Sequence, residues 1–172
     1  MSAMIRYLLD ANVFIEAKRR YYAFDICPGY WEALLAHHEG ERLASIDRIR
    51  NELLRGHDDL TEWVEREIPG TFFLSTADAR VTRYFGEMMR WVQEQAHFLP
   101  AAKAEFAQEA DGWLAAYAKA YDFMLATHEV LNHASRNRVP LPNVCEAFNV
   151  PYTNTFDMLR GLETQFEWRH TP

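Results

Sequence analysis

The feature that most constrains this chain is a short apolar run, Tyr7–Leu9, which ends on the carboxylate of Asp10. Such a run, bounded by polar residues, is typical of a buried strand in a parallel sheet that helices cover on both faces. Open α/β sheets bind ligands at the carboxyl ends of their strands, which is where Asp10 would lie. Aspartate is also a good helix N-cap, and a helical pattern begins near Asn12. On this stretch alone, a ligand-binding carboxylate and a helix cap are equally good interpretations.

The alternation of short apolar runs and helical patterns continues along the chain. Strands are predicted over residues 5–9, 43–46, 72–74, 123–126 and 150–152, and helices over 12–20, 28–38, 47–54, 60–67, 77–97, 101–120, 143–148 and 155–162. Asp47 is expected to cap the third of these helices, and Asn154 or Thr155 the last. Alternating strands and helices indicate right-handed crossovers and a parallel sheet. We therefore predict a single α/β domain over residues 1–172, with four to five parallel strands flanked by helices and a helical excursion at about 56–100.

Composition supports a folded domain and limits its partners. Hydrophobic residues make up 49% of the 172 positions and aromatic residues 14%, which is enough for a core. A net charge of −7 argues against a basic coat for tight, unspecific nucleic-acid binding, but it is compatible with an acidic metal site that has a local basic rim. Cys27 and Cys145 are far apart, so neither a disulfide framework nor a zinc knuckle is expected. We expect a cytoplasmic location and no membrane partner, since we find no signal peptide and no stretch of transmembrane length.

Four acids fall where the predicted elements meet one edge of the sheet. Asp10 follows the first strand, Glu52 lies in the helix after the second, Asp111 lies in the helix before the fourth, and Glu129 follows the fourth. Because the strands of a parallel sheet end on one rim, these side chains are expected to converge. Asp157, in the first turn of the last helix, is a possible additional acid of this site. Each acid alone is more often a helix cap or a solvated charge, so only the set as a whole indicates a site.

Four short segments carry a resemblance to a known family. They are Leu8-Leu9-Asp10-Ala11-Asn12-Val13-Phe14-Ile15, Ser45-x6-Glu52-Leu53-Leu54-x-Gly56, Asp111-x-x-Leu114-Ala115-Ala116-Tyr117-Ala118 and Leu125-Ala126-Thr127-x-Glu129. In order and separation they resemble the motifs of PIN-domain nucleases, which include the VapC-type toxin ribonucleases. The chain is longer than a minimal toxin, mainly between Gly56 and Pro100, and is most similar to a longer bacterial PIN-like branch. Glu129 stands where the family more often has aspartate, and Glu109 lies close to Asp111.

The resemblance implies a metal-dependent ribonuclease that hydrolyses phosphodiester bonds to a 3′-hydroxyl and a 5′-phosphate. It assigns metal binding to Asp10, Asp111 and Glu129, and either metal binding or orientation of the attacking water to Glu52. Crowded carboxylates repel one another unless a cation or proton resolves the repulsion. Hard oxygen ligands of this kind favour Mg²⁺ or Mn²⁺, which together with the phosphate and several waters completes such a site.

The resemblance also assigns supporting roles. Asn12 and Thr127 would support the metal ligands from behind or contact the phosphate. Basic residues that could rim the cleft and hold the RNA backbone are Lys18, Arg19, Arg48, Arg50, Arg136 and Arg138, although most of them are individually better explained as mixed solvated surface.

The sequence leaves other functions and partners open. The favoured hypothesis is the toxin of a toxin–antitoxin pair, with RNA as substrate and an antitoxin protein as a possible partner. The main alternative is a non-catalytic PIN-fold module that binds another protein through the aromatic-rich stretch 56–100. A weaker alternative is an acid-metal phosphatase or a DNA nuclease. Exposed aromatic residues of 56–100 could form a homodimer interface or receive a partner helix, and we expect a homodimer.

Overall fold

The computed structural model describes residues 3–170 and is built on a parallel sheet. Within this part of the chain the sheet has five strands in the order β3-β2-β1-β4-β5. The strands are β1 Tyr7–Leu9, β2 Leu43–Ile46, β3 Phe73–Leu74, β4 Met124–Ala126 and β5 Tyr152–Thr153, and every pairing is parallel. The predicted α/β class and the parallel sheet are therefore confirmed.

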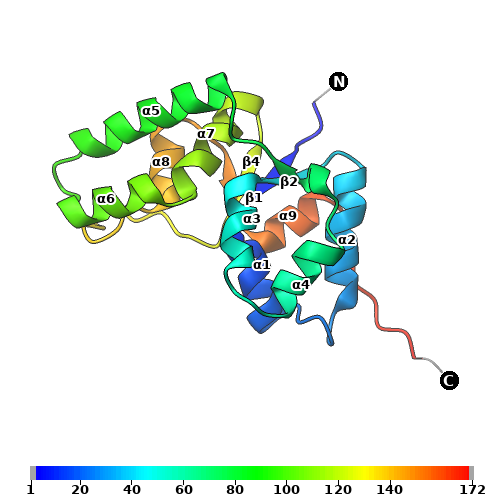
Figure 1. The fold of residues 1–172 in the computed structure, drawn as a ribbon. Helices are drawn as coiled ribbons and strands as arrows, with labels where there is room; N and C mark the ends of the chain where they lie inside the picture. The colour runs from blue at the N-terminus through cyan, green and yellow to red at the C-terminus, as the bar shows by residue number, and fades with distance from the viewer. Residues whose placement is uncertain (1–2, 171–172) are drawn as a thin grey trace.

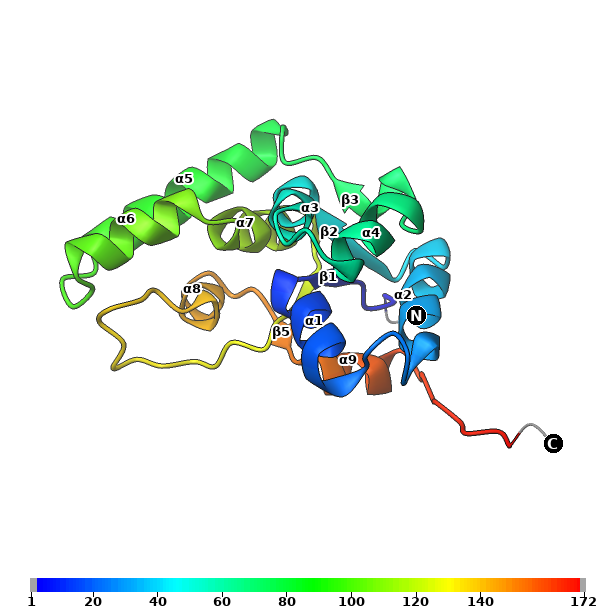
Figure 2. The same cartoon turned by 60° about the horizontal axis from the view of Figure 1, so that its bottom comes forward.

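Helices cover both faces of this sheet, as the crossover rule requires. They are α1 Ala11–Glu16, α2 Pro28–Glu39, α3 Asp47–Leu54, α4 Asp59–Arg66, α5 Ala79–Glu94, α6 Pro100–Gln108, α7 Asp111–Tyr121, α8 Leu141–Ala147 and α9 Thr155–Gly161. Figure 1 shows α5 to α8 on one side of the strands and α2, α4 and α9 on the other. Figure 2, turned by 60°, shows the same separation, with α1 beside α9. Within residues 3–170 no helix is long and apolar enough to cross a membrane.

The stretch 56–100 is an integral part of the sheet rather than an appendage. It contributes α4, the 3-10 turn Gly70–Phe72, the edge strand β3 and α5. Phe72, Phe73 and Met88 are buried, and the remaining large apolar residues of the stretch that were expected to offer a partner surface pack against the core: Trp63, Tyr84, Phe85, Met89 and Trp91. The aromatic side chains that suggested a docking surface are therefore largely used inside this protein.

Two predicted helices differ from the structure. The segment 101–120 is not one helix but two, α6 and α7, because Glu109 takes an extended backbone conformation (φ −80°, ψ 164°). The segment 12–20 begins as the α-helix α1 and continues as a π-helix over Ala17–Tyr21. Both changes come from tertiary packing, because residues 107–110 and 17–20 are all good helix formers.

The predicted cap at Asp47 is wrong. The N-cap of α3 is Ile46, which makes no side-chain capping bond. The Asp47 carboxylate instead accepts hydrogen bonds from the Thr76 amide at 3.0 Å and the Thr76 hydroxyl at 2.8 Å, and so joins α3 to the segment after β3. Asn154, one of the two expected residues, caps α9 by accepting a hydrogen bond from the Asp157 amide.

Candidate functional site

The pairing of β1 with β4 brings Asp10 and Thr127 together. Leu9 is opposite Ala126 in the parallel register, so the next residue of each strand leaves the sheet at the same level. The Thr127 hydroxyl donates to Asp10 Oδ2 at 2.8 Å, and the Ala11 amide donates to Asp10 Oδ1 at 2.7 Å. Asp10 is thus both the N-cap of α1 and a carboxylate fixed at the rim of the sheet, and its exposed fraction is only 5%.

Asn12 completes a brace behind this carboxylate. Its side-chain amide donates to the Thr127 hydroxyl oxygen at 3.2 Å, and its carbonyl oxygen accepts from the His128 amide at 3.1 Å. Because Thr127 is almost fully buried, the hydroxyl is held on Asp10 and orients it. The support role expected for Asn12 and Thr127 has a clear structural counterpart here, whereas a direct phosphate contact by Thr127 would require it to leave Asp10.

Asp111 approaches from the opposite layer as the first residue of α7. Gly112 lets this end of α7 lie close to α5, since a Cβ at that position would lie 2.8 Å from Met89 Cε and 3.1 Å from Phe85 Cε2. Asp111 is buried, and its Oδ2 is, among the described residues, the one buried side-chain polar atom without a hydrogen-bond partner. A buried, unpartnered carboxylate oxygen is costly unless a cation or a proton satisfies it.

Glu129 also reaches this cluster, but its oxygens are already used. Oε1 accepts from the Arg138 guanidinium, and Oε2 accepts from the Leu141 amide at 2.7 Å, at the start of α8. The side chain remains 12% exposed. Glu129 therefore contributes negative charge to the cluster while it anchors Arg138 beside Asp10 and Asp111.

These groups line one large, mainly polar cavity of about 940 Å³. Asp10, Glu52, Asp111 and Glu129 all lie on its wall, as the sequence predicted, together with Asn12. The four acids therefore lie around one cavity. Asp157, the possible additional acid, lies outside the cavity, and its exposed carboxylate pairs with Arg160 at 2.7 Å and accepts from the Asn154 side-chain amide at 3.0 Å.

Burial and mutual repulsion raise the pKa values of three acids of the cavity. Burial raises the pKa of Asp10 to about 7, and the charges of Glu129 and Glu52 add to this, while the hydrogen bond from Thr127 opposes it. Burial likewise raises the pKa of Asp111 well above its usual range, and the charges of Asp10 and Glu129 raise it further. Glu52 is exposed but lines the cavity, and partial desolvation there raises the pKa of its carboxyl. The cavity therefore favours a proton or a cation at its centre.

The donor set fits a hard divalent cation with few protein ligands. Asp10 and Asp111 offer carboxylate oxygens, and Mg²⁺ commonly takes one or two carboxylates with waters and phosphate oxygens. Across residues 3–170 no three acidic, imidazole or thiol groups are arranged to hold a metal ion together as the side chains stand. The hydrogen bonds of Glu129 explain this, because a third carboxylate ligand from that residue would have to release Arg138 or the Leu141 amide.

Two walls of the cavity contain residues that sequence reasoning missed. Glu16 and Arg20 line it beside Asn12, and Tyr21 follows them at the end of the π-helix. The sequence does contain a pattern that indicates Glu16 and Arg20, because residues 12, 16 and 20 recur at the four-residue spacing that places side chains on one helical face. On the facing wall, Glu105 and Gln108 come from α6, and no pattern in the sequence singles them out, whereas Glu109, at the end of α6, was noted for its closeness to Asp111.

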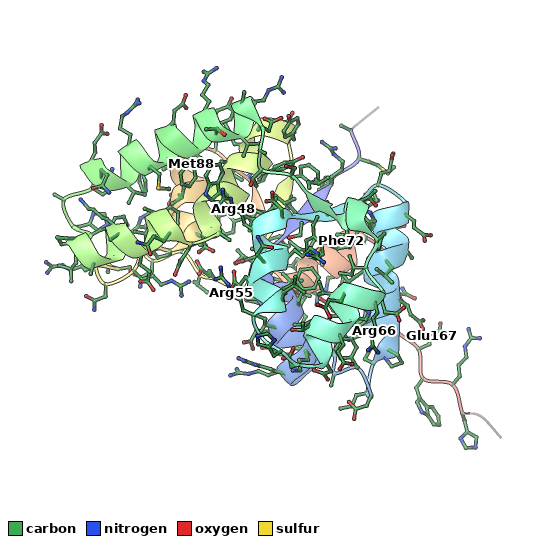
Figure 3. The ribbon with its side chains drawn as sticks, in the orientation of Figure 1. Arg48, Arg55, Arg66, Phe72, Met88 and Glu167 are labelled. Atoms are coloured by element: carbon green, nitrogen blue, oxygen red, sulfur yellow. The ribbon has the colours of Figure 1, made fainter. Side chains whose placement is uncertain are left out.

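The basic rim was predicted only in part. Of the six expected residues, Arg48 and Arg138 line the cavity, and Lys18 instead pairs with Asp58 at 2.5 Å and Asp59 at 2.8 Å. Arg55 was not expected, although it lies seven residues after Arg48 on the same face of α3. Figure 3 shows Arg48 and Arg55 on the side of α3 that faces α6 and α7.

Comparison with known proteins gives a family and a fold. Residues 7–166 match the family described as "Domain of unknown function (DUF4411)". The crystal structure of FitAcB from Neisseria gonorrhoeae is similar, with a TM-score of 0.55 and 20% sequence identity, and the match covers 87% of this chain and 98% of that one. No curated protein sequence matches the chain. At this identity the likeness establishes the fold alone, an α/β fold similar to that of FitAcB.

Proposed function

This chain belongs to the DUF4411 family, and we propose that its acidic cavity is the active site of a metal-dependent ribonuclease. The observation that carries the proposal is the buried pair Asp10 and Asp111, contributed by opposite helical layers, with Asp111 Oδ2 unpartnered. Such a pair is costly to keep as bare carboxylates, and a divalent cation removes that cost. The PIN-like fold and the resemblance of the motifs to VapC-type ribonucleases support the same function.

In this proposal Asp10 and Asp111 hold Mg²⁺ or Mn²⁺. When bound, the ion activates a water and stabilises negative charge on the attacked phosphate. Thr127 and Asn12 keep the Asp10 carboxylate in place. Glu129 reaches the ion only if it gives up its bonds to Arg138 and the Leu141 amide.

Glu52 is the group proposed to orient the attacking water and accept its proton. Its raised pKa brings it closer to neutral pH, where a carboxylate is a better base. The water oxygen forms a bond to phosphorus as the bond from phosphorus to the 3′-oxygen breaks, and the leaving 3′-oxygen takes a proton from solvent water, which leaves a 5′-phosphate and a 3′-hydroxyl. Arg48, Arg55 and Arg138 line the cavity and can hold the phosphate backbone on either side of the scissile bond.

The test uses the purified full chain and an end-labelled single-stranded RNA. We expect cleavage with Mn²⁺ or Mg²⁺, none in excess chelator, and a loss of at least about 100-fold in Asp10→Asn and Asp111→Asn. Asp157→Asn is the matched control, because Asp157 follows another strand of the same sheet but lies outside the cavity, and it should retain activity. Equal cleavage in chelator would refute the metal role, and cleavage by a folded Asp10→Asn protein would refute the site.

The toxin role and the partners are further parts of this proposal. If the chain is a toxin, its expression should arrest growth, and Asp10→Asn should abolish the arrest. If it is instead a non-catalytic binding module, Asp10→Asn should leave its biological effect intact. An antitoxin protein and a homodimer remain predictions from the sequence, and measurement of the mass in solution, alone and with any co-expressed neighbour, tests both.

A further inference from the structure

Three aromatic rings meet at the rim of the cavity, and the proposed hydrolysis uses none of them. They are Tyr21, His128 and Phe156, named here the aromatic platform. Tyr21 stacks with His128 at a centroid distance of 5.9 Å and an interplanar angle of 25°. Phe156 meets Tyr21 edge-on at 5.1 Å and His128 at 5.9 Å. Tyr21 and His128 line the same cavity as Asp10 and Asp111.

Distant parts of the chain hold this platform rigidly. Tyr21 ends the π-helix that follows α1, and single π-helical turns occur frequently at functional sites. The His128 ring is fixed by a hydrogen bond of 2.8 Å between Nε2 and the Thr155 hydroxyl, and its amide is bound by Asn12. The platform is thus joined through Asn12 to the brace that positions Asp10.

Tyr21 presents much of its aromatic surface to solvent although its ring contacts two others. Its exposed fraction is 47%, although His128 covers part of one ring face and Phe156 contacts its edge. Tyr21 belongs neither to the hydrophobic core nor to the half-buried apolar residues that pack against it. The exposed surface opens to a cavity that four arginines also line: Arg20, Arg48, Arg55 and Arg138.

The geometry points to Tyr21 as the stacking surface for one unpaired nucleobase of the RNA strand bound in this cavity. This inference rests on the proposed ribonuclease function. An aromatic face beside positively charged side chains is the combination by which proteins bind single strands, with bases on the rings and phosphates on the cations. A base inside a duplex is already stacked on both sides and cannot offer a face to Tyr21.

A binding assay and a cleavage assay together test the inference. The probe is a 12-nucleotide RNA that carries one 2-aminopurine, whose fluorescence is quenched when it stacks on an aromatic ring. With the full chain and Mn²⁺, we expect quenching on binding of the single strand and little binding of the same sequence in a duplex. Tyr21→Ala should weaken binding and raise KM by roughly 5- to 150-fold with kcat changed little, because stacking on a side chain contributes that much per base.

Matched variants separate stacking from an effect on the fold. Tyr21→Phe keeps the ring and should behave like the wild type, whereas Tyr21→Leu keeps apolar volume against Phe156 but should bind as weakly as Tyr21→Ala. Trp168→Ala removes an aromatic residue that is 83% exposed in the C-terminal tail, and it should change nothing. In each variant the rise in Tm with Mn²⁺ should persist, which shows that the Asp10 and Asp111 pair is intact.

The outcomes distinguish this inference from the ribonuclease proposal. Quenching that depends on Tyr21 without any cleavage would refute the nuclease function and leave the stacking site. Cleavage with unchanged KM and quenching in Tyr21→Ala would refute the stacking site and leave the nuclease. Preferred cleavage of the duplex, or no binding of the single strand, would also overturn the inference.

Discussion

Replacement of Asp10 by asparagine should make the metal-free protein more stable at alkaline pH. Burial raises the pKa of Asp10 from 3.8 to about 7. Between pH 3.8 and about pH 7 the folded protein retains a proton that the unfolded chain has released. The free energy of unfolding therefore falls as the pH rises through this range, and this loss of stability is complete once the pH exceeds about 7. Asparagine does not titrate, so Asp10→Asn escapes this loss.

The magnitude follows from the pKa. One pKa unit corresponds to about 1.4 kcal/mol, so ionisation of Asp10 costs the folded state about 4 kcal/mol in total, of which about 2 kcal/mol falls between pH 5.5 and pH 7. The difference in free energy of unfolding between Asp10→Asn and the wild type should therefore grow by about 2 kcal/mol from pH 5.5 to pH 8. This change does not depend on how the introduced amide bonds to Thr127, because that bond contributes equally at both pH values.

The assay is urea unfolding in chelator at pH 5.5 and pH 8, followed by thermal melts with and without Mn²⁺. For a chain of 172 residues the expected change corresponds to about 4–8 °C in the difference of the two Tm values. Mn²⁺ should raise the wild-type Tm more at pH 8 than at pH 5.5 and should hardly affect Asp10→Asn. Asp157→Asn should show no such pH dependence. An effect of Asp10→Asn on the free energy of unfolding that is the same at pH 5.5 and at pH 8 would refute this account of the site.

Four other substitutions test three separate features. Glu52→Gln removes a group at the cavity rim, so single-turnover cleavage should slow by about 100-fold or more while the Tm stays within about 2 °C. Gly161→Ala places a methyl group against the hydroxyl of buried Tyr7 and should lower the free energy of unfolding in urea by about 2 kcal/mol. Gly86→Ala adds a Cβ in α5 with no atom within 4 Å of it and should raise the same free energy by up to about 1 kcal/mol. Equal effects at the two glycines would contradict the packing around α9. Tyr30→Phe removes a buried hydrogen bond of 3.0 Å to a main-chain carbonyl of α1 and should cost about 1–2 kcal/mol in the same measurement, so an unchanged midpoint would show that this bond contributes little.

The parts of the site that could be predicted are those fixed by strand order. Asp10 and Thr127 each follow a buried apolar run directly, and any parallel pairing of those runs places the two side chains together at one rim. Glu52 lies in α3, which begins directly after β2, so it is placed near the same rim of the sheet. For these residues local sequence and sheet topology are sufficient, and no knowledge of side-chain packing is needed.

The parts that could not be predicted depend on breaks in otherwise good helices. Nothing in the residues around Glu109 forbids a continuous helix from Pro100 to Tyr121, yet the chain turns there so that Asp111 begins α7 inside the cavity. The π-helical turn that presents Tyr21 is likewise invisible in local propensity, because residues 17–20 favour an ordinary α-helix. In both places the packing of the layers overrides a weak local preference.

The position of Glu129 shows why the acids of this cavity are not equivalent, although the sequence presents them as one set. Arg138 and the Leu141 amide already satisfy Glu129, so its charge is balanced within the chain. Asp10 and Asp111 lack such a balance, since Asp10 accepts bonds only from neutral donors and Asp111 keeps an unpartnered oxygen. The binding free energy of a cation is therefore most favourable between the two aspartates, and ligation by Glu129 adds least to it. Substitution of Asp111 should accordingly weaken Mn²⁺ binding much more than Glu129→Gln does, and calorimetric titration of the two variants measures that difference directly.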